Sequence, residues 1–436
     1  MNRNINLGLT TLVSLTLSLS AQQVAEGYSN GTNSLAAGAG NVLVTSLGTV
    51  YFDGNDLMKV DGNSSQSLLT FASYTFGSFT SPIGSNKVLF GESSNGGIWS
   101  VPLNGGSPQL VANVAFNYDA VLLDDDRALI SAKTGGFAAA NNDVMFVDLL
   151  TGQTQLLAQF PGASGPLAID DAGDVYYATS SNTFPAPPGT VDVLKLSRAA
   201  VDGAILSNQV LGVADTTLVV QGLDAAGDLA FDDDGDLFFV DWFNGRIGEI
   251  NDADTAQATV APALIDYAGA AASGTSLQFL PPAAAAAQVF EPFQPAGGAL
   301  LIRETDYGSV NQIRTLAAAP AVLTASAASP IPAGAFSFDI QSGPAGGLGL
   351  VLFASGTLGG PVSLSVPGFE AGLLVDASLA TAPIVTTLFL DAAGAASLSL
   401  NNPGFATSFA AAAQPVVIST TGAIAAGAAQ QFQIGL

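Results

Sequence analysis

The strongest constraint on the fold of this chain is an internal repeat in its first three hundred residues. GPLAIDDAGDVYYATSSN at 165–182 matches GDLAFDDDGDLFFVDWFN at 227–244 almost position by position. Weaker copies of the same pattern occur at 46–60, 81–101, 120–133 and 296–313. A unit that recurs in this way predicts one structural module used several times.

Each unit has an apolar strand, a turn rich in Gly, Asp and Asn, a second aliphatic or aromatic strand, a polar loop and a third strand. Units 1 to 5 add a fourth strand. The first apolar residues after the turns are Val50, Val88, Leu129, Val175, Leu237 and Leu300, with spacings of 38, 41, 46, 62 and 63 residues. Four antiparallel strands at such intervals are typical of propeller blades. The 49 Gly and 22 Pro of the chain fit this frequency of turns. The sequence therefore predicts an all-β fold with a six-bladed β-propeller.

The sixth unit has no obvious fourth strand before Pro320. Residues 24–37 are expected to supply it and to join the first blade to the last. A ring closed in this way leaves no exposed edge strand.

LAFDDDGDLFFVDWFNGRIGEI at 229–250 resembles the repeat of NHL-type propellers. That repeat has an apolar strand, an Asp-x-x-Gly turn, an aliphatic strand ending in Asp, and Asn-x-Arg-Ile. The residues on this pattern are Asp232, Gly235, Asp241, Asn244, Arg246 and Ile247. The fourth unit keeps Asp170, Gly173 and Asn182 but lacks the Arg-Ile pair. The resemblance covers about 38–318 and implies a fold rather than an activity.

The composition changes sharply after the repeats. Residues 319–436 contain four acidic residues and no Lys or Arg, whereas 24–318 contain 31 acidic and 9 basic residues. Period-two alternation with Gly, Pro and Asn turns predicts a small antiparallel β-sandwich of seven or eight strands. Its segments at 331–354 and 373–400 resemble Ala/Gly-rich C-terminal modules of exported bacterial proteins. We expect such a module to serve cell-surface attachment or oligomer assembly, or to act as a passive cap.

The N-terminal residues have the pattern of a secretory signal. Arg3 precedes an apolar stretch from Ile5 to Leu19, and small residues follow. The predicted organisation is a signal peptide at 1–21, the propeller at 22–318 and the sandwich at 319–436. No later segment is a convincing membrane span. We therefore expect a secreted, extracellular or cell-surface protein, with the periplasm as the alternative.

Two absent residue types limit the chemistry. The chain has no Cys and no His, which removes disulfides, imidazole bases and Ser-His-Asp or Cys-His nucleophile systems. The net charge of −25 disfavours nucleic acid and anionic lipid as partners and favours cations.

The acidic run DDDGD at 232–236 has two interpretations. Asp232, Asp234 and Asp236 match the first ligands of a calcium loop, but Leu237 and Phe243 stand where an EF-hand needs Gly and Glu. A hairpin turn is the favoured interpretation, because an Asp-Asp pair recurs in two other units.

A second metal hypothesis concerns the ends of the second strands. Six-bladed propellers of the senescence-marker type bind a divalent cation on the channel axis, so the resemblance implies a candidate Ca²⁺ site. The nearest residues here are Asp53, Glu92, Lys133, Asp241, Glu304 and Asp306. Glu92, Asp241, Glu304 and Asp306 are the candidate ligands, with solvated rim charges as the alternative.

Two tryptophans are also candidates for ligand contact. Trp99 and Trp242 would either offer a flat platform to a sugar ring or pack between blades. The Pro-rich segment at 180–190 is expected to protrude from the surface.

Three functions fit these features. The first is a non-catalytic binding propeller that recognises an extracellular protein, a glycan or a neighbouring subunit. The second is a metal-dependent hydrolase or lactonase, in which a carboxylate acts as base and the metal polarises a carbonyl. The third is an extracellular filament or matrix subunit.

Overall fold

The structure consists almost entirely of antiparallel strands. The computed structural model describes residues 28–34, 41–61, 64–183, 186–232, 235–242, 247–250, 253, 263–265, 273–281, 299–305, 311–318, 322–341, 343, 346–354, 357–363, 372–375, 384–405, 407–418, 424–427 and 430–435. The predicted signal peptide at 1–21 lies outside them.

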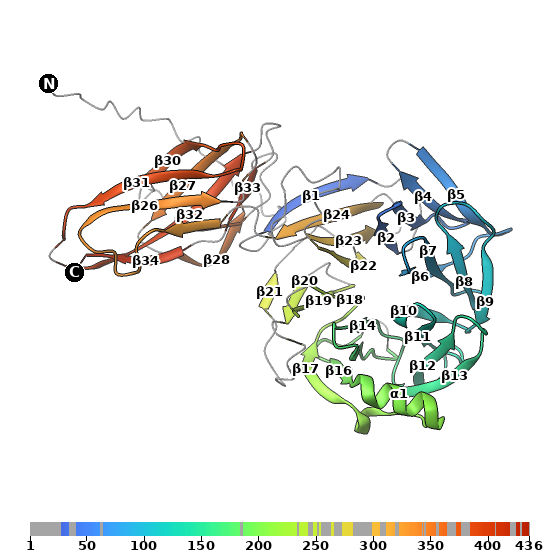
Figure 1. Cartoon of the computed structure of the whole chain (residues 1–436). Coiled ribbons are helices and arrows are strands. Elements are labelled where there is room, and N and C mark those ends of the chain that lie inside the picture. Colours follow the sequence, from blue (N-terminus) through green and yellow to red (C-terminus); the bar gives the residue numbers. More distant parts are fainter. Residues whose placement is uncertain are drawn as a thin grey trace.

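Six four-stranded sheets follow one another around a ring in the first part of the described chain (Figure 1). Blade 1 contains β2 (Val42–Thr45), β3 (Gly48–Phe52), β4 (Asp56–Asp61) and β5 (Ser64–Thr70). Blade 2 contains β6 (Gly77–Ile83), β7 (Lys87–Glu92), β8 (Gly97–Pro102) and β9 (Gln109–Asn113). Blade 3 contains β10 (Asn117–Asp124), β11 (Arg127–Ala132), β12 (Asn141–Asp148) and β13 (Thr154–Pro161).

The other three blades complete the ring. Blade 4 contains β14 (Leu167–Ile169), β15 (Val175–Ala178), β16 (Val191–Leu196) and β17 (Thr217–Leu223). Blade 5 contains β18 (Asp228–Phe231), β19 (Leu237–Val240), β20 (Ile247–Ile250) and β21 (Ala263–Ile265). Blade 6 contains β22 (Ser273–Leu280), β23 (Ala299–Thr305), β24 (Asn311–Ala318) and β1 (Tyr28–Ser34). The all-β propeller prediction is confirmed.

In blades 2 to 6 the second strand is the most deeply buried. The six marker residues of the repeat, from Val50 to Leu300, all lie on these second strands. All residues of β15, β19 and β23 are buried. A blade packs between two neighbours, so its inner strands are covered on both faces, and β15 and β19 are continuously apolar rather than alternating.

The acidic turns of the repeat shape the hairpins. The Asp170 carboxylate accepts a hydrogen bond of 2.8 Å from the Asp174 amide, and Gly173 supplies a φ of 82°. Asp232 accepts from the Asp236 amide at 2.9 Å, and Gly235 has a φ of 89°. Glycine adopts this left-handed backbone without a Cβ clash. The hairpin-turn interpretation of these aspartates is confirmed.

The ring closes between its two ends in sequence. β1 pairs antiparallel with β24, from Tyr28 opposite Ala318 to Ser34 opposite Gln312, so the predicted N-terminal closing strand is confirmed. The Gln278 side-chain amide, on β22, bonds the backbone N–H and C=O of Val44 at 2.8 and 3.0 Å. This amide continues the hydrogen bonding from blade 6 to blade 1.

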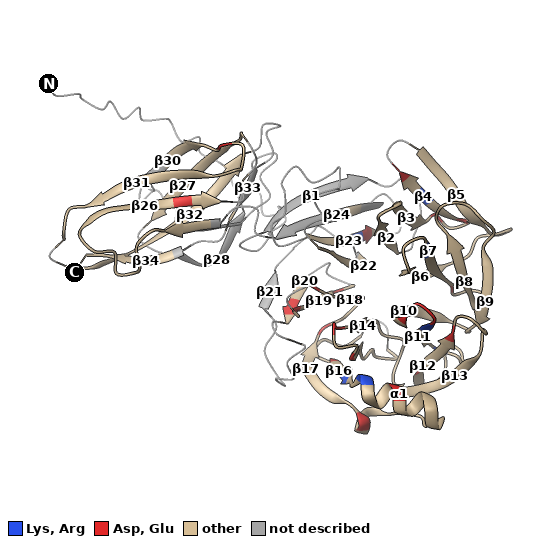
Figure 2. Cartoon of the chain, in the orientation of Figure 1, with Lys and Arg blue, Asp and Glu red and all other residues tan. Residues whose placement is uncertain are grey.

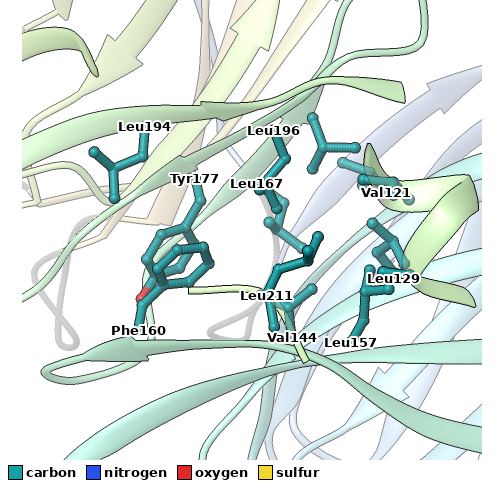
Figure 3. Packing of buried hydrophobic residues seen from close by; sticks show 14 of the residues in the cluster. Val121, Leu129, Val144, Leu157, Phe160, Leu167, Tyr177, Leu194, Leu196 and Leu211 are labelled. Carbon is teal, nitrogen blue, oxygen red and sulfur yellow. The ribbon is translucent and has the colours of Figure 1, made fainter. Parts of the chain in front are cut away.

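Apolar clusters lie between adjacent blades. Figure 3 shows the cluster between blades 3 and 4, where Phe160 and Tyr177 stack with ring centroids 4.6 Å apart. Val42 and Tyr51 of blade 1 join Leu280 and Leu301 of blade 6 in another cluster. Burial between sheets is thus distributed around the ring rather than gathered in one centre.

One helix was not predicted. α1 (Arg198–Ser207) and the 3₁₀ turn η1 (Val213–Asp215) lie between β16 and β17, which accounts for the long fourth repeat. Ser197 caps α1 by accepting from the Ala200 amide, and Val201 and Ala204 are buried. Ser197, the first residue of SRAAVDGAIL, is a typical N-cap residue from which the start of this helix could have been predicted.

The C-terminal part has two main sheets. Their strands are β25 (Val322–Ala325), β26 (Gly334–Gln341) and β31 (Ala396–Asn402) in one, and β27 (Leu348–Ala354), β30 (Ile384–Phe389), β32 (Phe409–Ile418), β33 (Ile424–Ala426) and β34 (Gln430–Ile434) in the other. β28 (Thr357–Ser363) and β29 (Gly372–Val375) form a hairpin. Phe338, Val351 and Val417 belong to the shared core.

The sandwich prediction is confirmed, but seven or eight strands is too low a number for the described residues. β25 and β33 have four and three residues, too short to show alternation in the sequence. The predicted limits of the propeller at 22–318 and of the sandwich at 319–436 stay predictions.

The sandwich lies beside blade 6, where β33 approaches β1 (Figure 1). Charged residues are concentrated on the propeller and sparse on the sandwich sheets (Figure 2). Within the described residues, no helix has the length and hydropathy to cross a membrane.

Candidate ligand pocket on one face of the propeller

A cavity of about 420 Å³ opens on one face of the propeller. Its walls come from loops that join second to third strands and fourth to first strands in blades 2 to 5. The described lining residues are Ser93, Phe116, Asn117, Tyr118, Lys133, Phe137, Ala163, Ser164, Ser180, Ser181, Asn182, Thr183, Ala186, Val191, Ala225, Ala226 and Trp242. The volume lies within the range of small-ligand sites.

Four aromatic side chains border this cavity: Phe116, Tyr118, Phe137 and Trp242. Phe137, in the β11–β12 loop, is 82% exposed, and its ring centroid lies 4.6 Å from that of Phe116. Trp242 follows β19 and is half-buried. Phe116 has a φ of 51°, in the left-handed region that a bulky side chain rarely adopts. Backbone strain at a ligand pocket is typical of a functional position.

Lys133 is the single charged side chain among the described lining residues, and it is only 5% exposed. Its Nζ donates to the Gly162 carbonyl at 3.2 Å and to the Asn182 side-chain oxygen. Burial lowers the pKa of Lys133, because desolvation penalises the ammonium form. The Asn182 amide in turn donates to the Ala140 carbonyl at 3.0 Å, which joins Asn182 to the β11–β12 loop of blade 3.

The floor of the pocket is built on the first strands of the blades. These strands are neighbours around the ring, so they line its axis. The Tyr118 hydroxyl of β10 donates to the Gly227 carbonyl before β18 at 2.9 Å, which links blade 3 to blade 5. Asn117 donates to the carbonyls of Glu92 and Val114 at 3.1 and 3.0 Å. These contacts hold the polar floor in one arrangement.

Two buried aspartates lie on the same first strands. Asp119 accepts from the Leu167 amide of blade 4 at 2.7 Å, and Asp228 accepts from the Leu277 amide of blade 6 at 2.6 Å. Burial raises the pKa of Asp119 to about 6. Burial also raises the pKa of Asp228 well above its usual range, and the charge of Asp119 raises it further. Each carboxylate therefore joins two blades at an electrostatic cost.

The candidate metal ligands have different surroundings. Glu92 is 2% exposed, and its carboxylate accepts from the Asn95 amide at 2.8 Å and from Thr75, so it organises the β7–β8 turn. Asp241 and Glu304 are 4% and 1% exposed, and Asp306 lies outside the described residues. In the part of the chain that the structure describes, no three Asp or Glu side chains are grouped as a metal site. The axial calcium site stays a prediction, which a calcium titration followed by thermal melting would test.

Of the other residues singled out from the sequence, Trp242 lines the cavity, whereas Asp53 and Trp99 have structural contacts elsewhere. Asp53 accepts from the Asp56 amide at 2.9 Å and shapes the β3–β4 turn. Trp99 packs against Phe71, with centroids 6.0 Å apart, as the packing alternative predicted, whereas Trp242 lines the cavity. Phe116 and Phe137 were missed. Phe137 lies within GGFAAANN, a run of small residues that does not have the pattern of a strand. An aromatic residue in such a loop is a sequence signal for an exposed ring.

Comparisons with known proteins give distant structural likeness only. No family model matches the chain, and no curated protein matches it. Regucalcin from Agrobacterium tumefaciens, a calcium-binding protein, matches at 11% identity and a TM-score of 0.46, over 69% of this chain and 97% of its own. A carbohydrate-active enzyme of family AA12 from Trichoderma reesei matches at 12% identity and a TM-score of 0.46, over 70% of this chain and 99% of its own. YCF48 bound to D1 peptide matches at 12% identity and a TM-score of 0.39, over 74% of this chain and 85% of its own. At these TM-scores the likenesses carry no argument about fold, pocket or ligand.

Proposed function

We propose that the propeller is a non-catalytic binding module that recognises a glycan through this pocket. The observation that carries the proposal is one cavity of about 420 Å³ that combines four aromatic rings, one of them a tyrosine, with seven Ser, Thr and Asn side chains. Sugars have apolar C–H faces that pack on aromatic rings and hydroxyls that bond with Ser, Thr and Asn. A few polar groups among apolar walls are typical of small-ligand sites.

A second aromatic pair suggests that the ligand is longer than the cavity. Tyr74 and Phe76, in the β5–β6 loop, are 61% and 55% exposed, with ring centroids 5.2 Å apart. The Phe76 carbonyl accepts from the amide of the pocket residue Ser93 at 2.9 Å. The two aromatic pairs therefore lie on the same face, joined by one hydrogen-bonded loop, and suit an oligosaccharide better than a single sugar.

Tryptophan fluorescence tests the proposal. The chain has two tryptophans, and W99F leaves Trp242 as the only reporter. The buried Trp99 Nε1 has no hydrogen-bond partner among the described residues, so this change removes an unsatisfied donor and should not unfold the protein. The W99F protein is titrated with neutral and uronate-containing hexasaccharides, and we expect quenching with at least one of them.

The matched control is F137A in the W99F background, which removes an exposed ring and should weaken binding about tenfold without changing the melting temperature. If no saccharide in the panel changes Trp242 fluorescence or binds by calorimetry, the glycan proposal fails. A protein ligand on the same face then becomes the better hypothesis.

Export is part of the proposal, supported by the signal-like pattern of residues 1–21. Expression of the full chain with a C-terminal tag, followed by N-terminal sequencing of the exported product, tests it. An intact N-terminus in the cytoplasmic fraction would contradict it. Cell-surface attachment or oligomerisation through the sandwich is likewise proposed, and cell fractionation and light scattering are its tests.

The repeats are proposed to be NHL-type. Asp232 and Gly235 support this by forming the expected turn, and Asp241 follows β19 as the repeat requires. Asn244 and Arg246 lie outside the described residues. A lower melting temperature of R246A than of the wild type is expected if Arg246 has the structural role that the repeat implies.

A further inference from the structure

Lys133 is a buried cation without a charged partner in the described structure. Its side chain is shielded from solvent, and its two recorded acceptors, the Gly162 carbonyl and the Asn182 amide oxygen, are both neutral. Lys195 gives the contrast, because its ammonium lies 2.8 Å from the Asp174 carboxylate. A buried charge without an opposite charge is costly, and the cost persists only where something else requires it.

The charge of Lys133 is also unusual for this molecule. The chain has 35 acidic and 10 basic residues, yet the described lining of the pocket contains one cation and no carboxylate. An ammonium has three N–H donors, of which two are used. The third is available to a group in the cavity.

We propose that the ligand is an acidic glycan whose uronate carboxylate pairs with Lys133. This rests on the proposed glycan-binding function and specifies the class of sugar. The carboxylate supplies the negative charge that the pocket lacks, while the pyranose ring packs on Phe116 and Phe137 beside it. The lowered pKa of Lys133 agrees with the absence of a nearby carboxylate in the ligand-free protein.

The pair would form in a shielded site, where charge-assisted hydrogen bonds are stronger than neutral ones. We expect a preference of about tenfold to a hundredfold for the charged ligand over its neutral form. Because a single Lys provides a point charge, it would discriminate by charge more than by the geometry of the anion.

The test uses one sugar in two charge states. Oligogalacturonate and its fully methyl-esterified form are titrated by calorimetry into the full chain, both as wild type and as K133Q. The glutamine removes the charge but keeps a group that can donate to Asn182 and Gly162. K133Q also removes a buried charge that has no charged partner among the described residues, so it should melt at the wild-type temperature or above. This melting temperature is the folding control.

We expect wild type to bind the acid at least tenfold more tightly than the ester, and K133Q to bind both with similar, weaker affinity. Equal binding of acid and ester by wild type would overturn the uronate assignment and leave the glycan proposal standing. An acid preference that persists in K133Q would overturn the role of Lys133. Binding of neither ligand, nor of any saccharide in the fluorescence panel, would overturn both proposals.

Discussion

Lys195 and Asp174 form an ion pair within blade 4, with the ammonium 2.8 Å from the carboxylate and both side chains largely buried. Asp170 lies 3.5 Å from the same ammonium. Blade 5 repeats the turn with Asp232 and Asp236, but its residue at the position of Lys195 is Glu249. Burial and these two aspartates raise the pKa of Glu249 to about 7.

This difference predicts that E249K stabilises the protein. The lysine would replace a like-charge cluster with the ion pair of blade 4, a gain of about 1–2 kcal/mol in the free energy of unfolding. Thermal melting at pH 7 measures it. The reciprocal change K195E should lower the melting temperature, and a destabilised E249K would show that the two blades are not equivalent at this position.

The buried aspartates predict a pH-dependent stability. The folded-state pKa of Asp119 is about 6, above the unfolded value of 3.8, and burial raises the pKa of Asp228 well above its usual range. The folded state therefore binds more protons in this range, and stability falls as pH rises from about 4 through 6 and above. For Asp119 alone the change is on the order of 2–3 kcal/mol.

The measurement is the melting temperature between pH 5 and pH 8 in the E249K background, because Glu249 titrates in the same window. D228N keeps one acceptor for the neighbouring amides and removes one of the two charges. We expect it to flatten the profile. A melting temperature of E249K that rises with pH over this range would contradict the burial argument.

Phe116 lines the pocket and has a left-handed backbone conformation. The only other described non-glycine residue with positive φ is Asn208, at the end of α1, where Asn commonly adopts this conformation. A left-handed backbone costs Phe116 about 1–2 kcal/mol. F116G relieves the strain and removes the ring, so we expect stability within about 1 kcal/mol of wild type and at least tenfold weaker oligosaccharide binding. Unchanged binding would place Phe116 outside the site.

Ring closure predicts the effect of an N-terminal deletion. Removing residues 1–34 deletes β1 and exposes the edge of β24, whose eight residues would be open to pairing with other chains. We expect a lower melting temperature and aggregation. Removal of 1–21 is the control and should leave the melting temperature unchanged, since β1 remains.

The net charge of −25 predicts an unusual salt dependence for an acidic ligand. Long-range repulsion slows the approach of the anion and is screened by salt, whereas a pair in the shielded pocket is screened much less. Raising NaCl from about 10 to about 150 mM, where the Debye length falls from about 30 to about 8 Å, should therefore increase the association rate of oligogalacturonate. Surface plasmon resonance measures it, and a slower rate at higher salt would indicate attraction by a surface charge patch instead.

Much of the fold was predictable because its signals are local. The marker residues from Val50 to Leu300 identified the second strand of every blade, and the Asp and Gly residues identified the turns between first and second strands. The closing strand β1 was predictable because the sixth unit lacked one strand. The helix α1 was missed, since its short apolar face lies within a stretch that the repeat pattern assigned to strands and loops.

The candidate site was much less predictable. Lys133 was recognised from its place after a second strand and Trp242 as an aromatic residue that could contact a ligand, but nothing in the sequence paired them with Phe116 or Ser164. Ser93 and Trp242 line one cavity from blades 2 and 5, far apart in the chain. Their proximity depends on how many blades fill the circle and how each is packed.

The sequence by itself determined the strands, their grouping into repeated units and the two-part organisation, because alternation, turn residues and charge composition act over a few neighbouring residues. Only the tertiary structure decided which loops share a face, which buried lysine has no counter-charge among the described residues and which phenylalanine has a strained backbone. Those properties arise from long-range packing of blade against blade, for which no short segment of the chain carries the information.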